Sequence, residues 1–179
     1  MIRDLAQVID NARSFIGQGW TYKLGGDSEK KKEIDCSAFV WRCLGDRKYD
    51  KSSGVWRNTS WLASSKALAI FDRLDEPVPG CIAVYGWSKY PNGKGKPGHC
   101  AIVVDPAAHT VIDASSSTNT VKERRVDRFW FPSKTQPKTY WLVPKGAEYV
   151  DESEEDSETR NLTLVALAVA GFWAFYASR

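Results

Sequence analysis

The sequence predicts an α+β fold in which N-terminal helices pack on a central antiparallel sheet. Residues 3–16 place apolar side chains at helical spacing, and a second helix is expected over residues 36–44. After residues 77–80 (PVPG) the pattern changes to short apolar runs separated by turn residues, which is typical of strands. Helices followed by consecutive strands indicate an α+β domain and not an alternating α/β domain.

Each expected helix has a residue at one or both ends that is typical of a helix start or a helix end. The first helix should end at Gly17, and the second should end just before Gly45. Asp35 is the expected N-cap of the second helix, because a short acidic side chain accepts hydrogen bonds from free N–H groups of the first turn. A third helix is expected over residues 61–70, with Thr59 or Ser60 as its cap.

The remaining segments are expected to be strands and loops. Residues 20–26 should be extended and close in a turn, and residues 27–34 should form a polar loop. The run of Pro, Asn and Gly residues over 87–98 predicts a second loop. The sheet strands are expected at residues 81–85, 100–104, 110–113, 119–121 and 139–143.

The chain is expected to divide into a folded body (residues 1–145), an acidic linker (146–160) and a hydrophobic helix (161–179). The linker contains the run DESEEDSE, which has the composition of a disordered segment. The last part contains sixteen consecutive uncharged residues. As a helix they would span about 24 Å against a hydrocarbon core of about 30 Å. A C-terminal membrane anchor is therefore expected, with a buried helix docked on the domain or on a partner protein as the alternative.

The charges and aromatic residues of the body narrow the choice of partners. Without the tail, residues 1–150 hold 23 basic and 16 acidic side chains. This balance suits an anionic polymer or a membrane surface, but it also suits an ordinary lysine-rich domain. No nucleic-acid recognition motif is found, so no nucleic-acid partner is expected. The eight Trp residues fit either core packing or a sugar-contacting surface. The N-terminus has no signal-peptide pattern.

The four cysteines do not form a metal-binding pattern. None lies in a C-x-x-C pair and the two histidines do not complete a zinc spacing, so no metal or cofactor is expected. Cys43 shares a helix face with Cys36. Cys81 and Cys100 lie in strand-like apolar runs and are expected to be small buried hydrophobic residues. No disulfide is expected among the four.

Three residues from three predicted elements indicate a catalytic thiol. Cys36 begins a helix, where free N–H groups and the helix dipole stabilise a thiolate. His99 opens an apolar strand and can hold the thiol proton, and Asp113 on the next strand can bond the other imidazole nitrogen. His109 is the rival base, expected to be exposed in a turn. Taken one at a time, these residues also fit a buried thiol, a hydrogen-bonded histidine and a solvated acid.

The order of these motifs resembles the NlpC family of papain-like cell-wall cysteine peptidases, over roughly residues 5–143. The matching motifs are Tyr22, Gly25-Gly26, Asp35-Cys36-Ser37, Pro79-Gly80, His99 with Ala101-Ile102-Val103, and Asp113-Ala114-Ser115. Two positions depart from the family pattern. Cys81 stands where the family usually has an acid, and Asp113 stands where it often has His, Asn or Gln.

The resemblance implies a papain-like NlpC-type fold and hydrolysis of an amide bond in the stem peptide of peptidoglycan. In that interpretation Cys36 attacks the carbonyl carbon, His99 protonates the leaving amine and Asp113 orients His99. Tyr22 would form a hydrogen bond near the thiolate or the oxyanion. The expected partners are the stem peptide, a lipid bilayer through the C-terminal helix, and proteins of a virion or a membrane complex.

Several alternatives remain open at the level of the sequence. The enzyme can belong to a bacteriophage, as a virion-associated or lysis enzyme, or to a cell that remodels its wall. The same triad also serves a membrane-anchored thiol acyl hydrolase or transferase acting on lipid. A third class is a catalytically silent structural module of a membrane assembly.

Overall fold

The computed structural model describes residues 1–86, 88–89, 95–96, 98–131 and 138–148. One compact unit spans Met1–Tyr149. The predicted hydrophobic helix over 161–179 and most of the predicted linker lie outside the described residues. Within the described ranges, none of the helices has the length and apolar character needed to cross a membrane.

The helices begin where short polar side chains cap them. Helix α1 spans Leu5–Ser14 behind Asp4, and helix α2 spans Cys36–Cys43 behind Asp35, as predicted. The third predicted helix is different. Helix α3 covers only Thr59–Leu62 and is capped by Asn58, and a separate 3₁₀ turn (η1) follows at Ser65–Ala69. Ser64 accepts a hydrogen bond from the N–H of Lys66 and so starts a new turn where one continuous helix was expected.

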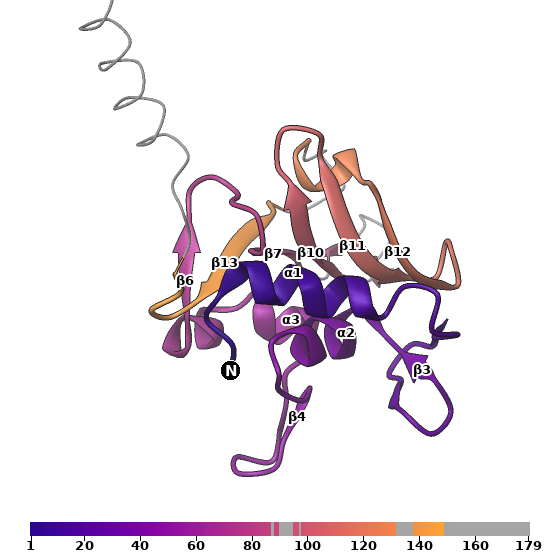
Figure 1. Cartoon of the computed structure of the whole chain (residues 1–179). Coiled ribbons are helices and arrows are strands. Elements are labelled where there is room, and N and C mark those ends of the chain that lie inside the picture. The colour runs from indigo at the N-terminus through magenta and orange to yellow at the C-terminus, as the bar shows by residue number, and fades with distance from the viewer. Residues whose placement is uncertain (87, 90–94, 97, 132–137, 149–179) are drawn as a thin grey trace, which may run out of the picture. The chain divides into compact units, whose positions relative to one another are not determined.

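The main sheet has six strands in the order β12-β11-β10-β7-β13-β6, and all its neighbouring pairs are antiparallel (Figure 1). Its strands are β6 Phe71–Leu74, β7 Ile82–Tyr85, β10 His99–Asp105, β11 Thr110–Ser115, β12 Thr120–Arg125 and β13 Tyr140–Pro144. The α+β prediction is confirmed, because helices α1, α2 and α3 all precede the strands of the main sheet in the chain. Strand β6 was not predicted.

Three smaller strand groups lie outside this sheet. Strand β3 (Glu33–Ile34) pairs with both β1 (Thr21–Tyr22) and β2 (Asp27–Ser28). A hairpin joins β4 (Tyr49–Asp50) to β5 (Val55–Trp56), and another joins β8 (Ser88–Lys89) to β9 (Gly95–Lys96). The loops predicted over 27–34 and 87–98 therefore each contain a short strand pair.

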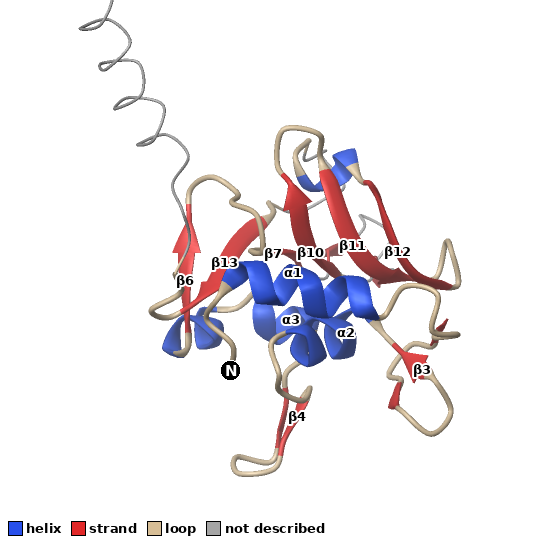
Figure 2. Ribbon diagram, in the orientation of Figure 1, coloured by secondary structure: helices blue, strands red, loops and turns tan. Residues whose placement is uncertain are grey.

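Alternate residues of each strand face opposite sides of the sheet, and each side has its own apolar cluster. Helices α1 and α2 cover one side, and α2 packs against both β10 and β11 (Figure 2). Every residue of α2 except Arg42 is buried. On the other side, Phe129 from the 3₁₀ turn η2 (Asp127–Phe129) packs with Tyr85 and Val103. Because α2 packs directly against β10, the helix that begins with Cys36 is held beside the strand that begins with His99.

Candidate active site

Cys36 is the first residue of α2, and its neighbour Asp35 sets this position. One carboxylate oxygen of Asp35, Oδ1, accepts hydrogen bonds from the Ala38 N–H and the Ser37 hydroxyl, both at 2.8 Å. The other oxygen, Oδ2, accepts one from the N–H of Gly25 at 3.0 Å. The Cys36 side chain therefore lies in the first turn of the helix, where N–H groups without intrahelical partners favour a negative charge. Only 4% of Cys36 is exposed.

His99 and Asp113 are brought together as the sequence predicted. His99 is the first residue of β10, Asp113 lies on the neighbouring strand β11, and His99 Nε2 is 2.7 Å from Asp113 Oδ2. The imidazole ring also stacks on Phe129, with ring centroids 5.8 Å apart and planes at 21°. These contacts fix the orientation of the ring and leave Nδ1 available for the thiol.

Charges around Cys36 and His99 favour an ion pair between them. Hydrogen bonds from Cys100 and His99 hold the pKa of the Cys36 thiol well below its usual value, although burial opposes them. Burial would lower the pKa of His99, but its hydrogen bonds to Asp113 and Cys36 raise that pKa to about 9. Both shifts favour the thiolate and the imidazolium, the form in which a thiol is a nucleophile.

Asp113 is completely buried and stays ionised. Burial opposes its charge, but hydrogen bonds from His99 and Arg124 lower the pKa of the Asp113 carboxyl below its usual value. Arg124, on β12, binds Asp113 through two nitrogens: Nε is 2.9 Å from Oδ1, and Nη2 is 2.7 Å from Oδ2. The carboxylate thus accepts from both partners and keeps His99 in a single orientation.

Tyr22, the fourth predicted site residue, lies at the end of β1 and lines a cavity of about 380 Å³ together with His99. Burial and the nearby negative charges of Cys36 and Asp35 raise the pKa of Tyr22 far above its usual value. Its phenol is therefore always protonated and can only act as a neutral hydrogen-bonding group. The other residues that line the cavity are Leu24, Tyr85, Gly98, Ser115, Ser116, Ser117, Arg124 and Arg128.

Sequence reasoning missed four polar neighbours of the site. Cys100, expected to be a simple buried residue, donates a hydrogen bond to the Cys36 thiolate. The hydroxyl oxygen of Thr59 lies 3.9 Å from the Cys36 sulfur. The strand predicted at 119–121 was too short to include Arg124. Had it been extended to Arg125, the alternation of side chains along a strand would have placed Arg124 on the same face of the sheet as Asp113. Lys48, which pairs with Asp35, had no local signal.

His109 does not compete with His99. It lies in a turn with a positive φ of 55°, as expected, but it is half-buried and not exposed. Its Nδ1 is 2.8 Å from Asp127, and its ring stacks on Trp130. All four cysteines are buried free thiols. Within the described part of the chain, no group of three or more His, Cys, Asp and Glu side chains is arranged to hold a metal ion.

Comparisons with known proteins give resemblances of structure only, since no family model and no curated protein sequence matches the chain. One similar structure is the P60 domain of an antigen from M. avium subspecies paratuberculosis, with 18% identity, a TM-score of 0.48, and coverage of 81% of this chain and 96% of that one. Another is the peptidoglycan hydrolase RipB from Mycobacterium tuberculosis, with 18% identity, a TM-score of 0.47, and coverage of 81% and 65%. A third is NlpC1 from Trichomonas vaginalis, with 15% identity, a TM-score of 0.49, and coverage of 78% and 45%.

Proposed function

We propose that this protein is a cysteine peptidase or amidase that hydrolyses an amide bond in the stem peptide of peptidoglycan. One observation carries the chemistry: Cys36 begins a buried helix beside His99, whose other ring nitrogen lies 2.7 Å from Asp113. A thiolate next to an oriented imidazolium is the arrangement of a thiol acyl hydrolase. The order of the motifs around these residues, which resembles the NlpC family, supports the choice of substrate.

The reaction runs in two halves on the same residues. The Cys36 thiolate attacks the carbonyl carbon of the amide, and the tetrahedral intermediate collapses to a thioester as His99 gives its proton to the leaving amine. A water molecule then attacks the thioester while His99 takes its proton, and the thiolate is released with the acid. Asp113 remains ionised throughout, holding the ring and stabilising the imidazolium.

The oxyanion of the intermediate needs hydrogen-bond donors near the sulfur. The backbone N–H of Cys36 is a suitable donor, because it belongs to the first turn of α2 and has no intrahelical acceptor. The phenol of Tyr22 stays protonated and lines the cavity that His99 also lines, and it is the second donor in this proposal. Arg124, which is paired with Asp113, and Arg128, which bonds the Tyr85 hydroxyl, also line this cavity.

The decisive experiment is digestion of purified peptidoglycan by the full-length chain, with the fragments identified by mass spectrometry. New amino termini within the stem peptide are expected from the wild type and from Cys43→Ala, a control on the opposite end of the same helix. Cys36→Ala should produce none. Intact stem peptides with the reduced wild-type protein would contradict the proposal.

The uncharged run over residues 162–177 favours one second candidate, a membrane-anchored thiol acyl hydrolase or transferase acting on lipid. It predicts cleavage of a lipid thioester or ester by the full-length chain and no release of wall fragments. A catalytically silent module is the remaining alternative, and an unreactive Cys36 towards an alkylating reagent at neutral pH would point to it. The bacteriophage origin, the virion partners and the membrane location stay predictions from the sequence.

A further inference from the structure

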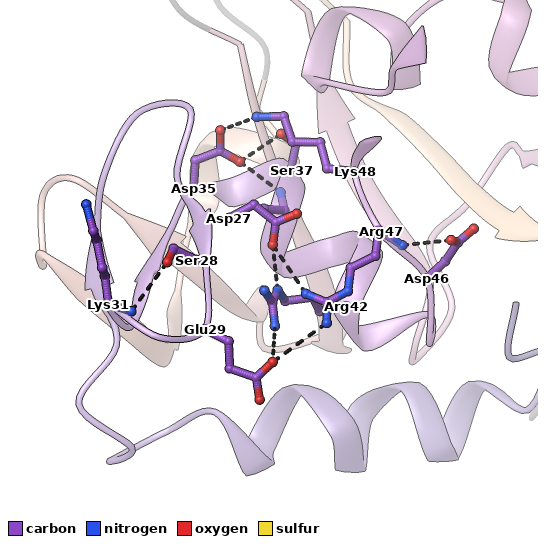
Figure 3. Close-up of polar contacts among 11 residues, drawn as sticks. Asp27, Ser28, Glu29, Lys31, Asp35, Ser37, Arg42, Asp46, Arg47 and Lys48 are labelled. Carbon is purple, nitrogen blue, oxygen red and sulfur yellow. Dashed lines mark hydrogen bonds and ion pairs between the residues drawn. The ribbon is translucent and has the colours of Figure 1, made fainter. Parts of the chain in front are cut away.

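A second buried carboxylate lies directly beside the nucleophile and is paired with a buried lysine. The Asp35 side chain is 5% exposed and the Lys48 side chain 7% exposed, and the ammonium group of Lys48 bonds Oδ2 of Asp35. Figure 3 shows Lys48 at one oxygen of the Asp35 carboxylate and the Ser37 hydroxyl at the other. Lys48 comes from the segment just before β4 and not from α2 itself.

Helix capping alone does not account for this pair. Asn and Ser cap helices about as well as Asp and carry no charge, and the bonds to Ser37 and Ala38 use only one oxygen of Asp35. The other oxygen accepts from the Gly25 N–H, which needs no ion pair, and from Lys48. Burying two opposite charges also carries a desolvation penalty of several kcal/mol per ion, which is recovered only with good geometry and full hydrogen bonding. The pair is therefore better explained by what it does next to Cys36.

The negative charge of Asp35 disfavours the thiolate of Cys36, which the proposed chemistry requires. The Asp35 carboxylate acts to raise the pKa of Cys36, against the effect of His99. Lys48 supplies a positive charge that acts to lower the pKa of Cys100, the residue that hydrogen-bonds Cys36. The titratable or charged groups that face Cys36 from the surrounding elements are Tyr22 from β1, Asp35 from the cap, Tyr85 from β7, and His99 and Cys100 from β10.

We propose that Lys48 is a positioning residue for the nucleophile: its ammonium group holds the Asp35 carboxylate in the cap and balances its charge, so that Cys36 can carry a negative charge beside it. Asp35 then organises the first turn of α2 without repelling the thiolate. This inference rests on the thiolate of the proposed function but not on its substrate.

The test is the pH dependence of Cys36 alkylation by iodoacetamide in the full-length protein, followed at the Cys36 peptide by mass spectrometry. Lys48→Met removes the charge, and Lys48→Gln removes it but keeps a hydrogen-bond donor for Asp35. Asp35→Asn removes the opposing charge and keeps a cap. Lys51→Met, three residues away in the exposed turn of the same hairpin, is the matched control.

If Lys48 acts through its charge, the Lys48 variants and the Asp35 variant should shift the midpoint of the alkylation profile in opposite directions. Both Lys48 variants should raise the midpoint of the alkylation profile by about one pH unit, which slows alkylation about tenfold at a pH below the midpoint. Asp35→Asn should lower the midpoint, and the double variant Asp35→Asn/Lys48→Met should return it close to the wild-type value. Lys51→Met should leave it unchanged.

A purely structural role gives a different pattern. It predicts lower thermal stability in the Lys48 variants with an unchanged midpoint, or a double variant that behaves like Lys48→Met alone, and either result would overturn the inference. If Lys48→Met does not fold, Lys48→Gln and the double variant decide. A wild-type midpoint at the value of an ordinary thiol, about 8.5, would instead overturn the thiolate of the proposed function.

Discussion

At the scale of single residues, the candidate site combines the Cys36–His99 pair with two buried carboxylates, each of which has its own cationic partner. Asp113 is matched by Arg124 from β12, and Asp35 is matched by Lys48 from the segment before β4. Each carboxylate therefore keeps its place as a hydrogen-bond acceptor with its charge largely neutralised. The Cys36–His99 pair between them can then hold one negative and one positive charge without a large excess of either sign.

The pKa shifts of this reactive pair predict a bell-shaped pH profile for kcat/KM. The acid limb should lie well below the usual range of a thiol, because activity appears as Cys36 loses its proton. The alkaline limb should lie near pH 9, because above this value His99 is neutral and cannot protonate the leaving amine. The measurement is the rate of stem-peptide cleavage across both limbs; activity that is still constant well above pH 9 would contradict the assignment of His99.

The His99–Asp113 contact was predictable from the sequence, whereas the pairing of Lys48 with Asp35 was not. Fourteen residues with a turn between two strands are enough to place both side chains on neighbouring strands, and the structure has them in contact. Lys48 reaches Asp35 only because the chain folds back after α2, and no local pattern encodes that approach. The catalytic roles of Cys36, His99, Asp113 and Tyr22 remain predictions that the digestion experiment tests.

At the scale of elements, the sequence predicted the parts that depend on short local patterns, but not a strand that is defined by its pairing with a distant segment. The cap at Asp35 and four of the five predicted sheet strands lie at nearly the same residues in the structure, and each rests on a short pattern within one segment. The fifth, predicted at 119–121, runs from Thr120 to Arg125. Strand β6 (Phe71–Leu74) was missed because an edge strand with two exposed charged residues has little apolar signal. It is identified only by its pairing with β13, far along the chain.

The junction between β7 and β10 is the element that positions His99, and Gly98 is critical there. A Cβ atom at Gly98 would lie 2.6 Å from the Tyr85 carbonyl oxygen and 2.9 Å from the Gly86 carbonyl carbon, both of them backbone atoms that cannot easily move. Gly98→Ala should therefore displace the start of β10, lower the free energy of unfolding by about 1–3 kcal/mol and slow Cys36 alkylation. Urea unfolding and the alkylation rate measure the two effects.

Gly86→Ala is the matched control for this substitution. Among the described residues, a Cβ atom there would meet only the Ala63 side chain, at 3.2 Å, so a small shift relieves the contact. We expect it to lower the free energy of unfolding by less than Gly98→Ala does and to leave the alkylation rate close to that of the wild type. Equal effects of the two substitutions would contradict the role given to Gly98.

At the scale of the whole molecule, the compact unit Met1–Tyr149 holds every residue of the candidate site. A chain ending at Tyr149 is therefore expected to keep the alkylation profile and the thermal unfolding midpoint of the full-length protein. The predicted membrane anchor adds a second measurement: only the full-length chain should float with lipid vesicles in a density gradient. Loss of thiol reactivity in the shorter chain would show that residues 150–179 contribute to the site.

The position of β13 has a consequence for synthesis on the ribosome. Strands β7, β10, β11 and β12 come in this order in the chain and pair as neighbours, so these four of the six strands, which carry His99 and Asp113, can form as they emerge. Strand β6 emerges before all of them but pairs only with β13, the last strand. The nascent chain must therefore leave β6 unpaired until β13 has been made, so the compact unit completes its main sheet only when its last strand has been made.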